Sequence, residues 1–233
     1  MHRRRALALL AGAGAVLSPL TPTFLTSGVS TATGGGSTLG AAITSDDIMF
    51  RFIQARNVGD GAAVITWPSG WTLCSDGTRS AGNNTSSGNL VSACAWAPGG
   101  TTIGTCGVSA GSPTAWSEVI VAYNNVDFDH VNGPLLEVRP NSAGGGSTIA
   151  TTAFTDLPGF DVRLIGATYS RTAAQGVKDV TGMTRRAAVS ASAVDNNTVA
   201  GDLLASSRGS VTITWDATGT KTTHQMALRP RYA

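Results

Sequence analysis

The near absence of lysine and glutamate is the feature that most constrains the fold of this 233-residue chain. Lys178, Lys221, Glu118 and Glu137 are its only residues of these types, which usually fill the exposed positions of helices. Charged residues make up 13% of the chain, about half the usual share. Gly, Ser and Thr together supply about a third of it. The composition therefore disfavours long surface helices and favours an all-β fold.

Short apolar runs separated by turn residues recur from about residue 41 onward, at the spacing typical of an antiparallel β-sandwich or barrel. In the first half we expect strands at Ile48 to Arg56, Ala62 to Thr66, Trp71 to Cys74, Leu90 to Trp96, Ile103 to Val108, and Glu118 to Tyr123. In the second half we expect them at Leu135 to Val138, Thr148 to Phe154, Val162 to Tyr169, Met183 to Ala188, Leu203 to Ser207, Val211 to Trp215, and His224 to Arg229.

A faint internal repeat relates the two sets of strands. The matching segments are Asp47 to Phe52 with Asp161 to Ile165, Ser69 to Thr72 with Thr181 to Thr184, and Asn84 to Leu90 with Asn197 to Leu204. Two similar halves would bury their apolar faces against each other, which predicts one domain over residues 41–233. The expected fold is an antiparallel β-sandwich, jelly-roll-like or a duplicated pair of half-sandwiches, although low-complexity β sequence can also match itself by chance.

The N-terminal forty residues have two interpretations. Arg3 to Arg5, the apolar run Ala6 to Leu17 and the small residues Ser30 to Ala32 have the three parts of a cleaved secretory signal. Alternatively the segment is a retained, extended arm. In that case Arg3, Arg4 and Arg5 would make polar contacts with another protein and an apolar set would lie against it, namely Leu17, Leu20, Phe24 and Leu25. In both cases the stretch from residue 30 to residue 40, rich in Gly, Ser and Thr, is expected to be a linker.

Net charge argues against a nucleic-acid partner. The chain carries +2, but without Arg3, Arg4 and Arg5 it has 13 Lys and Arg against 14 Asp and Glu. No basic face of the kind that binds phosphates is therefore expected. The apolar run Ala6 to Leu17 is too short for a membrane span.

Catalytic patterns are missing from the sequence. It has no Gly-x-Ser-x-Gly turn, and Gly144 to Ser147 lacks the lysine of a phosphate-binding loop. His130, beside Asp127 and Asp129, is interpreted as part of a solvated loop rather than a metal ligand. Glu118 begins an expected strand and is interpreted as a strand-end residue. We therefore expect neither an enzyme nor a bound cofactor or metal.

The cysteines and tryptophans leave specific alternatives open. Cys74, Cys94 and Cys106 could pack as small buried residues, or Cys94 and Cys106 could form a disulfide across a hairpin centred on Gly100. Trp67, directly before a proline, is the candidate for an exposed ring that contacts a partner or a sugar.

Four segments carry a family resemblance: Thr66 to Leu73, Cys94 to Gly99, Trp116 to Asp127, and Gln225 to Pro230. Over about residues 41–230 the chain resembles a β-sandwich domain of minor tail and other virion surface proteins of bacteriophages of actinobacteria. It departs from the family's pattern at Trp96, where a lysine is common.

The resemblance implies a structural or adhesive role without a catalytic set. We expect a minor tail or decoration protein on the surface of a phage particle, present in several copies and docked on other virion proteins by its N-terminal arm, with a host envelope glycan as a further partner. The alternative is a secreted bacterial carbohydrate-binding or adhesion module with a cleaved signal peptide.

Overall fold

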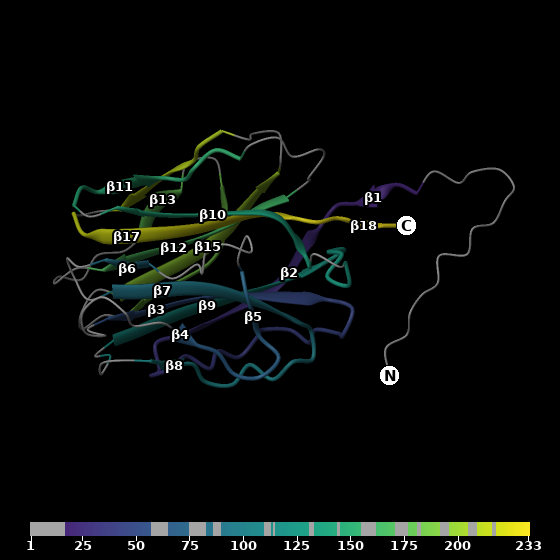
Figure 1. The fold of residues 1–233 in the computed structure, drawn as a ribbon, viewed down its shortest axis with the longest axis horizontal. Coiled ribbons are helices and arrows are strands. Elements are labelled where there is room, and N and C mark those ends of the chain that lie inside the picture. The colour runs from purple at the N-terminus through teal and green to yellow at the C-terminus, as the bar shows by residue number, and fades with distance from the viewer. Residues whose placement is uncertain are drawn as a thin grey trace, which may run out of the picture.

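The computed structural model describes residues 17–56, 65–74, 83–85, 90–109, 113, 115–130, 133–143, 145–154, 162–170, 177–180, 183–191, 196–204, 209–215 and 218–233. All regular secondary structure in these ranges is β-strand, and all of the strand pairs are antiparallel (Figure 1). The expected all-β sandwich is confirmed.

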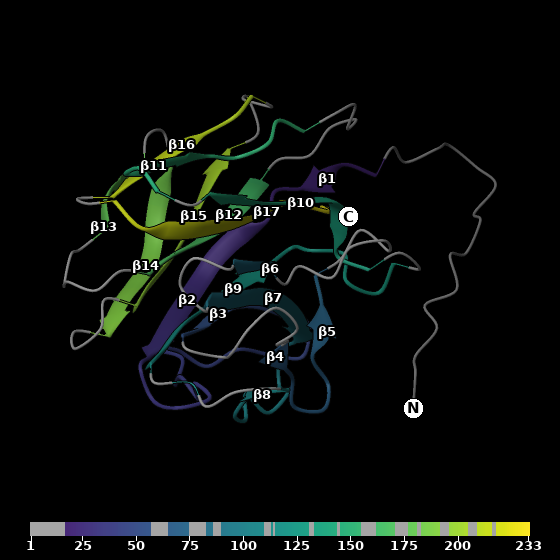
Figure 2. The same cartoon turned by 60° about the vertical axis from the view of Figure 1, so that its left-hand side comes forward.

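The first half of the chain builds one sheet of six strands. Its order is β2 (Thr23–Ser30), β9 (Ala115–Asn124), β3 (Ile48–Arg56), β7 (Leu90–Pro98) and β5 (Thr72–Leu73), with β6 (Asn83–Thr85) also paired to β7. The second half builds a sheet of five strands. Its order is β10 (Leu135–Ala143), β17 (Thr220–Leu228), β12 (Val162–Ser170), β15 (Asn196–Leu204) and β14 (Thr184–Ala191). Figure 2 shows the two sheets as separate layers.

Smaller sheets repeat the same relation between the halves. In the first half β4 (Ile65–Thr66), which comes after β3, pairs with β8 (Gly107–Val108), which comes after β7. In the second half β13 (Val177–Val180), after β12, pairs with β16 (Thr212–Trp215), after β15, and β16 also pairs with β11 (Thr148–Ala150). Because each half forms its own sheet in the same strand order, the sandwich is a duplicated pair of half-sandwiches.

The duplication extends to single residues of the central strands β3 and β12. On β3, Phe50 and Phe52 pack between the two main sheets, whereas Ile53 packs with Ile65 of β4 on the other face. On β12, Leu164 packs between the sheets and Ile165 packs with Ile213 of β16. Alternate residues of a strand point to opposite faces, so the repeated sequence pattern fixes which face of each sheet is inside.

One pair of segments matched in the expected repeat is not equivalent in the structure. Asn84 to Leu90 was matched with Asn197 to Leu204, but β7 is the counterpart of β15 because both lie beside the central strand. The sequence also predicted only Leu203 to Ser207 as a strand, whereas β15 begins at Asn196. Paired asparagines and a glycine are typical of turns, yet Asn197 and Thr198 are buried in this strand.

The folded region also begins earlier than the expected boundary at residue 41. Seven residue pairs join β2 to β9, from Thr23 with Asn124 to Ser30 with Glu118. The expected linker packs as well, since Gly34, Gly35 and Ser37 are buried. A cut after Ala32, the site that resembles signal cleavage, would remove an edge strand and leave the β9 backbone groups without partners.

A tight contact between the two sheets, from Gly166 to Phe52, predicts a measurable coupling between these residues. Gly166 of β12 faces the Phe52 ring, and a Cβ at Gly166 would overlap ring carbons. Gly166→Ala is therefore expected to lower the free energy of unfolding by about 1–3 kcal/mol, measured by urea denaturation. In a Phe52→Leu background the same substitution should cost clearly less, because the smaller side chain leaves room. Equal costs in the two backgrounds would contradict this contact.

Candidate docking surface

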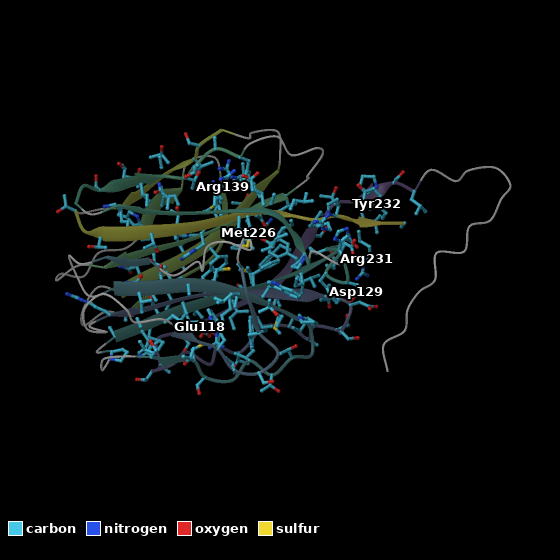
Figure 3. The ribbon with its side chains drawn as sticks, in the orientation of Figure 1. Glu118, Asp129, Arg139, Met226, Arg231 and Tyr232 are labelled. Atoms are coloured by element: carbon cyan, nitrogen blue, oxygen red, sulfur yellow. The ribbon has the colours of Figure 1, made fainter. Side chains whose placement is uncertain are left out.

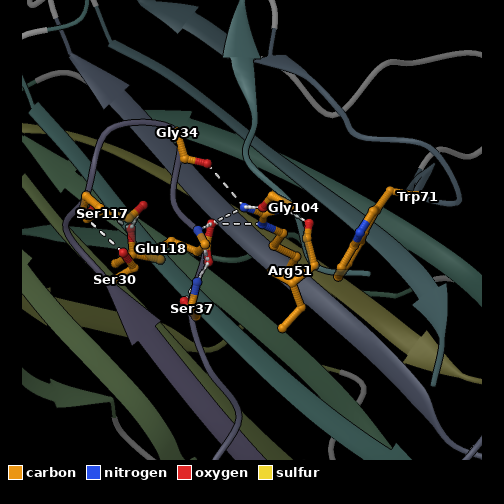
Figure 4. A network of polar contacts seen from close by, with 12 residues as sticks. Ser30, Gly34, Ser37, Arg51, Trp71, Gly104, Ser117 and Glu118 are labelled. Carbon is orange, nitrogen blue, oxygen red and sulfur yellow. Dashed lines mark hydrogen bonds and ion pairs between the residues drawn. The ribbon is translucent and has the colours of Figure 1, made fainter. Parts of the chain in front are cut away.

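A buried ion pair holds the N-terminal segment on the first sheet. Arg51 of β3 and Glu118 of β9 are both fully buried, and the Arg51 Nε donates to Glu118 Oε2 at 2.8 Å (Figure 4). The other guanidinium nitrogens donate to the backbone carbonyls of Ile103, Gly34 and Gly104 at 2.8 to 3.2 Å. Glu118 is therefore a central residue of a buried network, not the strand-end residue that the sequence predicted.

The glycine-rich turn at residues 34–37 closes over the other side of the carboxylate. The backbone N–H groups of Gly36 and Ser37 donate to Glu118 Oε1 at 3.2 and 2.9 Å, and the Ser37 hydroxyl donates to the same oxygen. Gly35 has a φ of 81°, and a Cβ there would overlap the carboxylate. Only glycine allows the backbone to approach the carboxylate this closely, which explains the composition of the segment.

Two tryptophans cover the Arg51 side of this network. Trp67 and Trp71 stack at 6.2 Å between ring centroids, and Arg51 lies 5.8 and 5.4 Å from the two rings. Trp67 is half-buried, with its indole nitrogen inside the protein. The ring predicted to be exposed therefore stacks within the molecule, and it offers only part of its surface to a partner.

The second half contains the counterpart of this ion pair with a neutral acceptor. Arg163 of β12 corresponds to Arg51, and its Nε donates to Gln225 Oε1 of β17 at 2.9 Å. Glu118 pairs in register with Ile53 and Gln225 with Ile165, in both cases two residues beyond the arginine. The Arg163 guanidinium lies 4.8 Å from the Phe154 ring. One architectural position therefore holds a carboxylate in one half and an amide in the other.

Exposed large apolar side chains gather on the terminal strands. Among the described residues they are Leu17, Leu20, Leu25, Val29 and Tyr232, 36 to 55% exposed, together with Leu73 on β5. The first five lie on, or directly before, β1 (Pro19–Leu20), β2 and β18 (Arg231–Tyr232). We call these five residues the terminal apolar surface, which covers both faces of the β1–β18 ribbon because Tyr232 pairs with Pro19 and Leu20 pairs with Arg231. Leu17, Leu20 and Leu25, predicted as docking residues, belong to it, and Figure 3 marks Tyr232 at this end of the molecule.

Hydrogen bonds join the two terminal segments into one ribbon. Ser18 and Ala233 exchange a pair of backbone hydrogen bonds of 3.1 Å, and β1 pairs with β18. The Asn125 side chain donates to the Thr21 carbonyl at 3.2 Å, and the Arg231 N–H donates to the Asn125 carbonyl at 2.8 Å. The terminal apolar surface therefore lies on paired strands whose positions are fixed relative to the sandwich.

Phe24 has a different role from its predicted neighbours, because it anchors β2 to both sheets. Its ring packs edge-on against Tyr123 at 5.8 Å, and the Arg186 guanidinium of β14 lies 4.7 Å from it. Arg186 donates to Asp202 at 2.8 Å, and the Tyr123 hydroxyl donates to the same carboxylate. Burial, and then the Asp202 charge, raise the pKa of Tyr123 well above its ordinary value.

A polar cluster that the sequence did not reveal lies between the two main sheets. The Ser92 hydroxyl of β7 contacts the Thr222 hydroxyl at 2.5 Å and His224 Nε2 at 3.1 Å, both on β17. The hydroxyls of Ser117 and Thr198 form a second contact across the sheets at 2.7 Å. Ser92 and His224 have the residue types of a nucleophile and its base. Both are fully buried, and burial lowers the pKa of His224 to about 4.

Of the two alternatives for the cysteines, the structure shows small buried residues and no bond between Cys94 and Cys106. Cys74, Cys94 and Cys106 are all buried and unbridged. Cys94 packs with Phe52 between the sheets, whereas Cys106 packs with Ile53 on the opposite face of the first sheet. The hairpin about Gly100 is absent because β7 ends at Pro98 and β8 pairs with β4 instead.

Arg3, Arg4 and Arg5 lie outside the described residues. Over the described ranges no group of three His, Cys, Asp or Glu side chains could hold a metal ion. None of the described segments is a helix long and apolar enough to cross a membrane. Comparisons with protein-family models, with curated proteins and with solved structures find no match to this chain.

Proposed function

We propose that this protein is a non-enzymatic structural component of a bacteriophage particle, a minor tail or decoration protein. It docks through the terminal apolar surface and the residues before it, and it displays the duplicated sandwich for surface stabilisation or host adhesion. The observation that carries this proposal is the position of the exposed apolar side chains. Four of the six large ones among the described residues lie on β1, β2 and β18, and Leu17 lies two residues before β1.

The occupant of this surface is another protein of the particle. The surface begins at Leu17, where the apolar run Ala6 to Leu17 ends, and the run is preceded by Arg3, Arg4 and Arg5. Burying a large aliphatic side chain contributes about 1.5–3 kcal/mol, so several such side chains are enough to hold a multi-copy component in place. The arginines match a partner whose docking site has an acidic rim.

The rest of the molecule suits display. The paired sheets bury Phe50, Phe52 and Met226 in one apolar core, and the ion pair beneath residues 34–37 fixes the N-terminal segment to it. A rigid scaffold of this kind presents its loops to solvent without changing shape, and several copies per particle raise the avidity of weak contacts.

The test compares two substitutions of leucines with equal exposure. Leu25 on β2 and Leu73 on β5 are both 38% exposed, but only Leu25 belongs to the terminal apolar surface. Particles assembled without this chain are incubated with purified full-length variants, and bound copies are counted by quantitative mass spectrometry. Leu25→Ser should reduce occupancy about tenfold, and Leu73→Ser should leave it unchanged. Equal occupancy of both variants would reject this docking surface.

The N-terminus of the natural product distinguishes the virion component from the secreted carbohydrate-binding module. A virion component with a retained arm should carry residues 1–16 on the particle. A product found only in culture fluid, cleaved after Ala32 and bound to polysaccharide, would support the secreted carbohydrate-binding module and overturn the proposal.

A further inference from the structure

Two of the three cysteines meet across neighbouring strands. Register pairs join Thr72 to Trp96 and Leu73 to Ala95 between β5 and β7, and continuing this register places Cys74, the residue after β5, opposite Cys94. The Cys74 N–H donates to the Cys94 carbonyl at 3.0 Å, and the two Sγ atoms are 2.8 Å apart. We propose that Cys74 and Cys94 form a structural disulfide when this protein folds in an oxidising compartment. This inference does not rest on the docking surface.

The backbone geometry already suits the bond. Directly opposed residues of antiparallel strands have Cα atoms about 4.5–5.5 Å apart, within the range of natural disulfides. Bringing the sulfurs from 2.8 Å to the bond length of about 2.05 Å requires a shift below about 1 Å. Cys106 cannot compete for Cys94 in the folded protein because the two lie on opposite faces of the sheet.

The bond would fix the weakest attachment in the first sheet. β5 contributes two residues to the edge beyond β7, so few backbone hydrogen bonds hold it. A bond between Cys74 and Cys94 closes a loop of about twenty residues, which restricts the unfolded chain and stabilises the fold. Such bonds persist in proteins outside the reducing cytosol, which include extracellular particles and secreted domains.

The oxidation is a thiol–disulfide exchange with a low-molecular-weight disulfide such as oxidised glutathione. One cysteine thiolate attacks the small disulfide and displaces one small thiol, and the second cysteine then displaces the other. Two S–H bonds are lost, one S–S bond forms, and two electrons and two protons pass to the small disulfide. Burial raises the pKa of Cys94 well above its ordinary value, so we place the reaction during folding, before the second sheet packs over Cys94.

Peptide mapping of the full chain tests the bond. The protein is refolded with a mixture of reduced and oxidised glutathione, its free thiols are blocked with an alkylating reagent, and it is digested with trypsin without reduction. Cys74 falls in the peptide 57–79, whereas Cys94 and Cys106 share the peptide 80–163 because trypsin does not cut between Arg139 and Pro140. The expected product joins these two peptides, is about 2 Da lighter than their sum, and carries the alkyl label on Cys106.

Cysteine variants identify which two cysteines are bonded. Cys106→Ser should retain the joined peptides, and Cys74→Ser should abolish them. Oxidation of the natural chain should raise its Tm by roughly 5–10 °C over the reduced protein. Three alkylated cysteines after refolding in the glutathione mixture, or a bond that includes Cys106, would overturn the proposal whether or not the chain docks on particles.

Discussion

Glu118→Ala is expected to lower the free energy of unfolding by about 3–5 kcal/mol, measured by urea denaturation followed by tryptophan fluorescence. The substitution leaves the fully buried Arg51 guanidinium without its counter-charge. It also removes the acceptor of the Gly36 and Ser37 N–H groups. Faster amide hydrogen exchange at these two residues should accompany the loss, because the turn over the carboxylate opens.

The only other glutamate in the chain provides the matched control. Glu137 pairs with Arg139, whose side chain is 35% exposed. Solvent screens such a pair, so Glu137→Ala should change the free energy of unfolding by no more than about 1 kcal/mol. Equal effects at Glu118 and Glu137 would show that the buried network does not hold the N-terminal segment.

The duplicated architecture suggests a further variant that tests the role of Glu118. Glu118→Gln places an amide at the position in the first half that is equivalent to Gln225, whose amide oxygen accepts from Arg163. It should cost less than Glu118→Ala, because the amide oxygen still accepts from Arg51. The double variant Arg51→Met with Glu118→Leu should recover most of the loss, since apolar replacement of both buried charges is often close to neutral.

The second large effect is a loss of stability in mild acid. His224 is fully buried beside Ser92, and burial lowers its pKa to about 4. The unfolded chain, with a histidine pKa near 6.5, therefore binds a proton that the folded protein excludes between these two values. The free energy of unfolding should be independent of this group above about pH 7 and should fall by about 3 kcal/mol as the pH drops from 6.5 to 4.

Histidine variants isolate this effect from the titration of carboxylates. Unfolding is measured by urea denaturation at a series of pH values for the natural chain, His224→Gln and His130→Gln. His224→Gln should flatten the slope between pH 6.5 and 4 whatever its stability at neutral pH. His130→Gln, in a loop outside the inter-sheet cluster, should keep the slope. Parallel curves for His224→Gln and the natural chain would contradict the assignment.

Local pattern allowed much of the sandwich to be predicted. The run Ile48 to Arg56 was recognised as a strand at its observed bounds, and its match with Asp161 to Ile165 identified the two central strands of the duplication. β2 was missed because Thr23 to Ser30 follows an apolar run and precedes glycines, so the pattern favoured an arm. β15 was missed because its paired asparagines are typical of turns.

The candidate site was less accessible to sequence reasoning than the fold. Leu17, Leu20 and Leu25 were predicted as apolar contact residues and are exposed, but Phe24 and Trp67 are half-buried against other aromatic rings of the molecule. The alternative of a bond between Cys94 and Cys106 is wrong because it depended on a hairpin that does not form, and Cys94 lies beside Cys74 instead. Each of these errors concerns which residues become neighbours, not which residues prefer strands.

The sequence by itself determined that this chain folds into sheets. The scarcity of lysine and glutamate and the alternation of apolar residues are local properties, and local properties set the preference of each short segment for a strand. The sequence also placed the duplication, because the repeated alternation sets the inner face of each half. Only the tertiary structure decided that Glu118 is buried against Arg51, 67 residues away, and that Cys74 meets Cys94. Contacts at such separations depend on strand order, which is fixed when whole sheets assemble and not by the residues beside each partner.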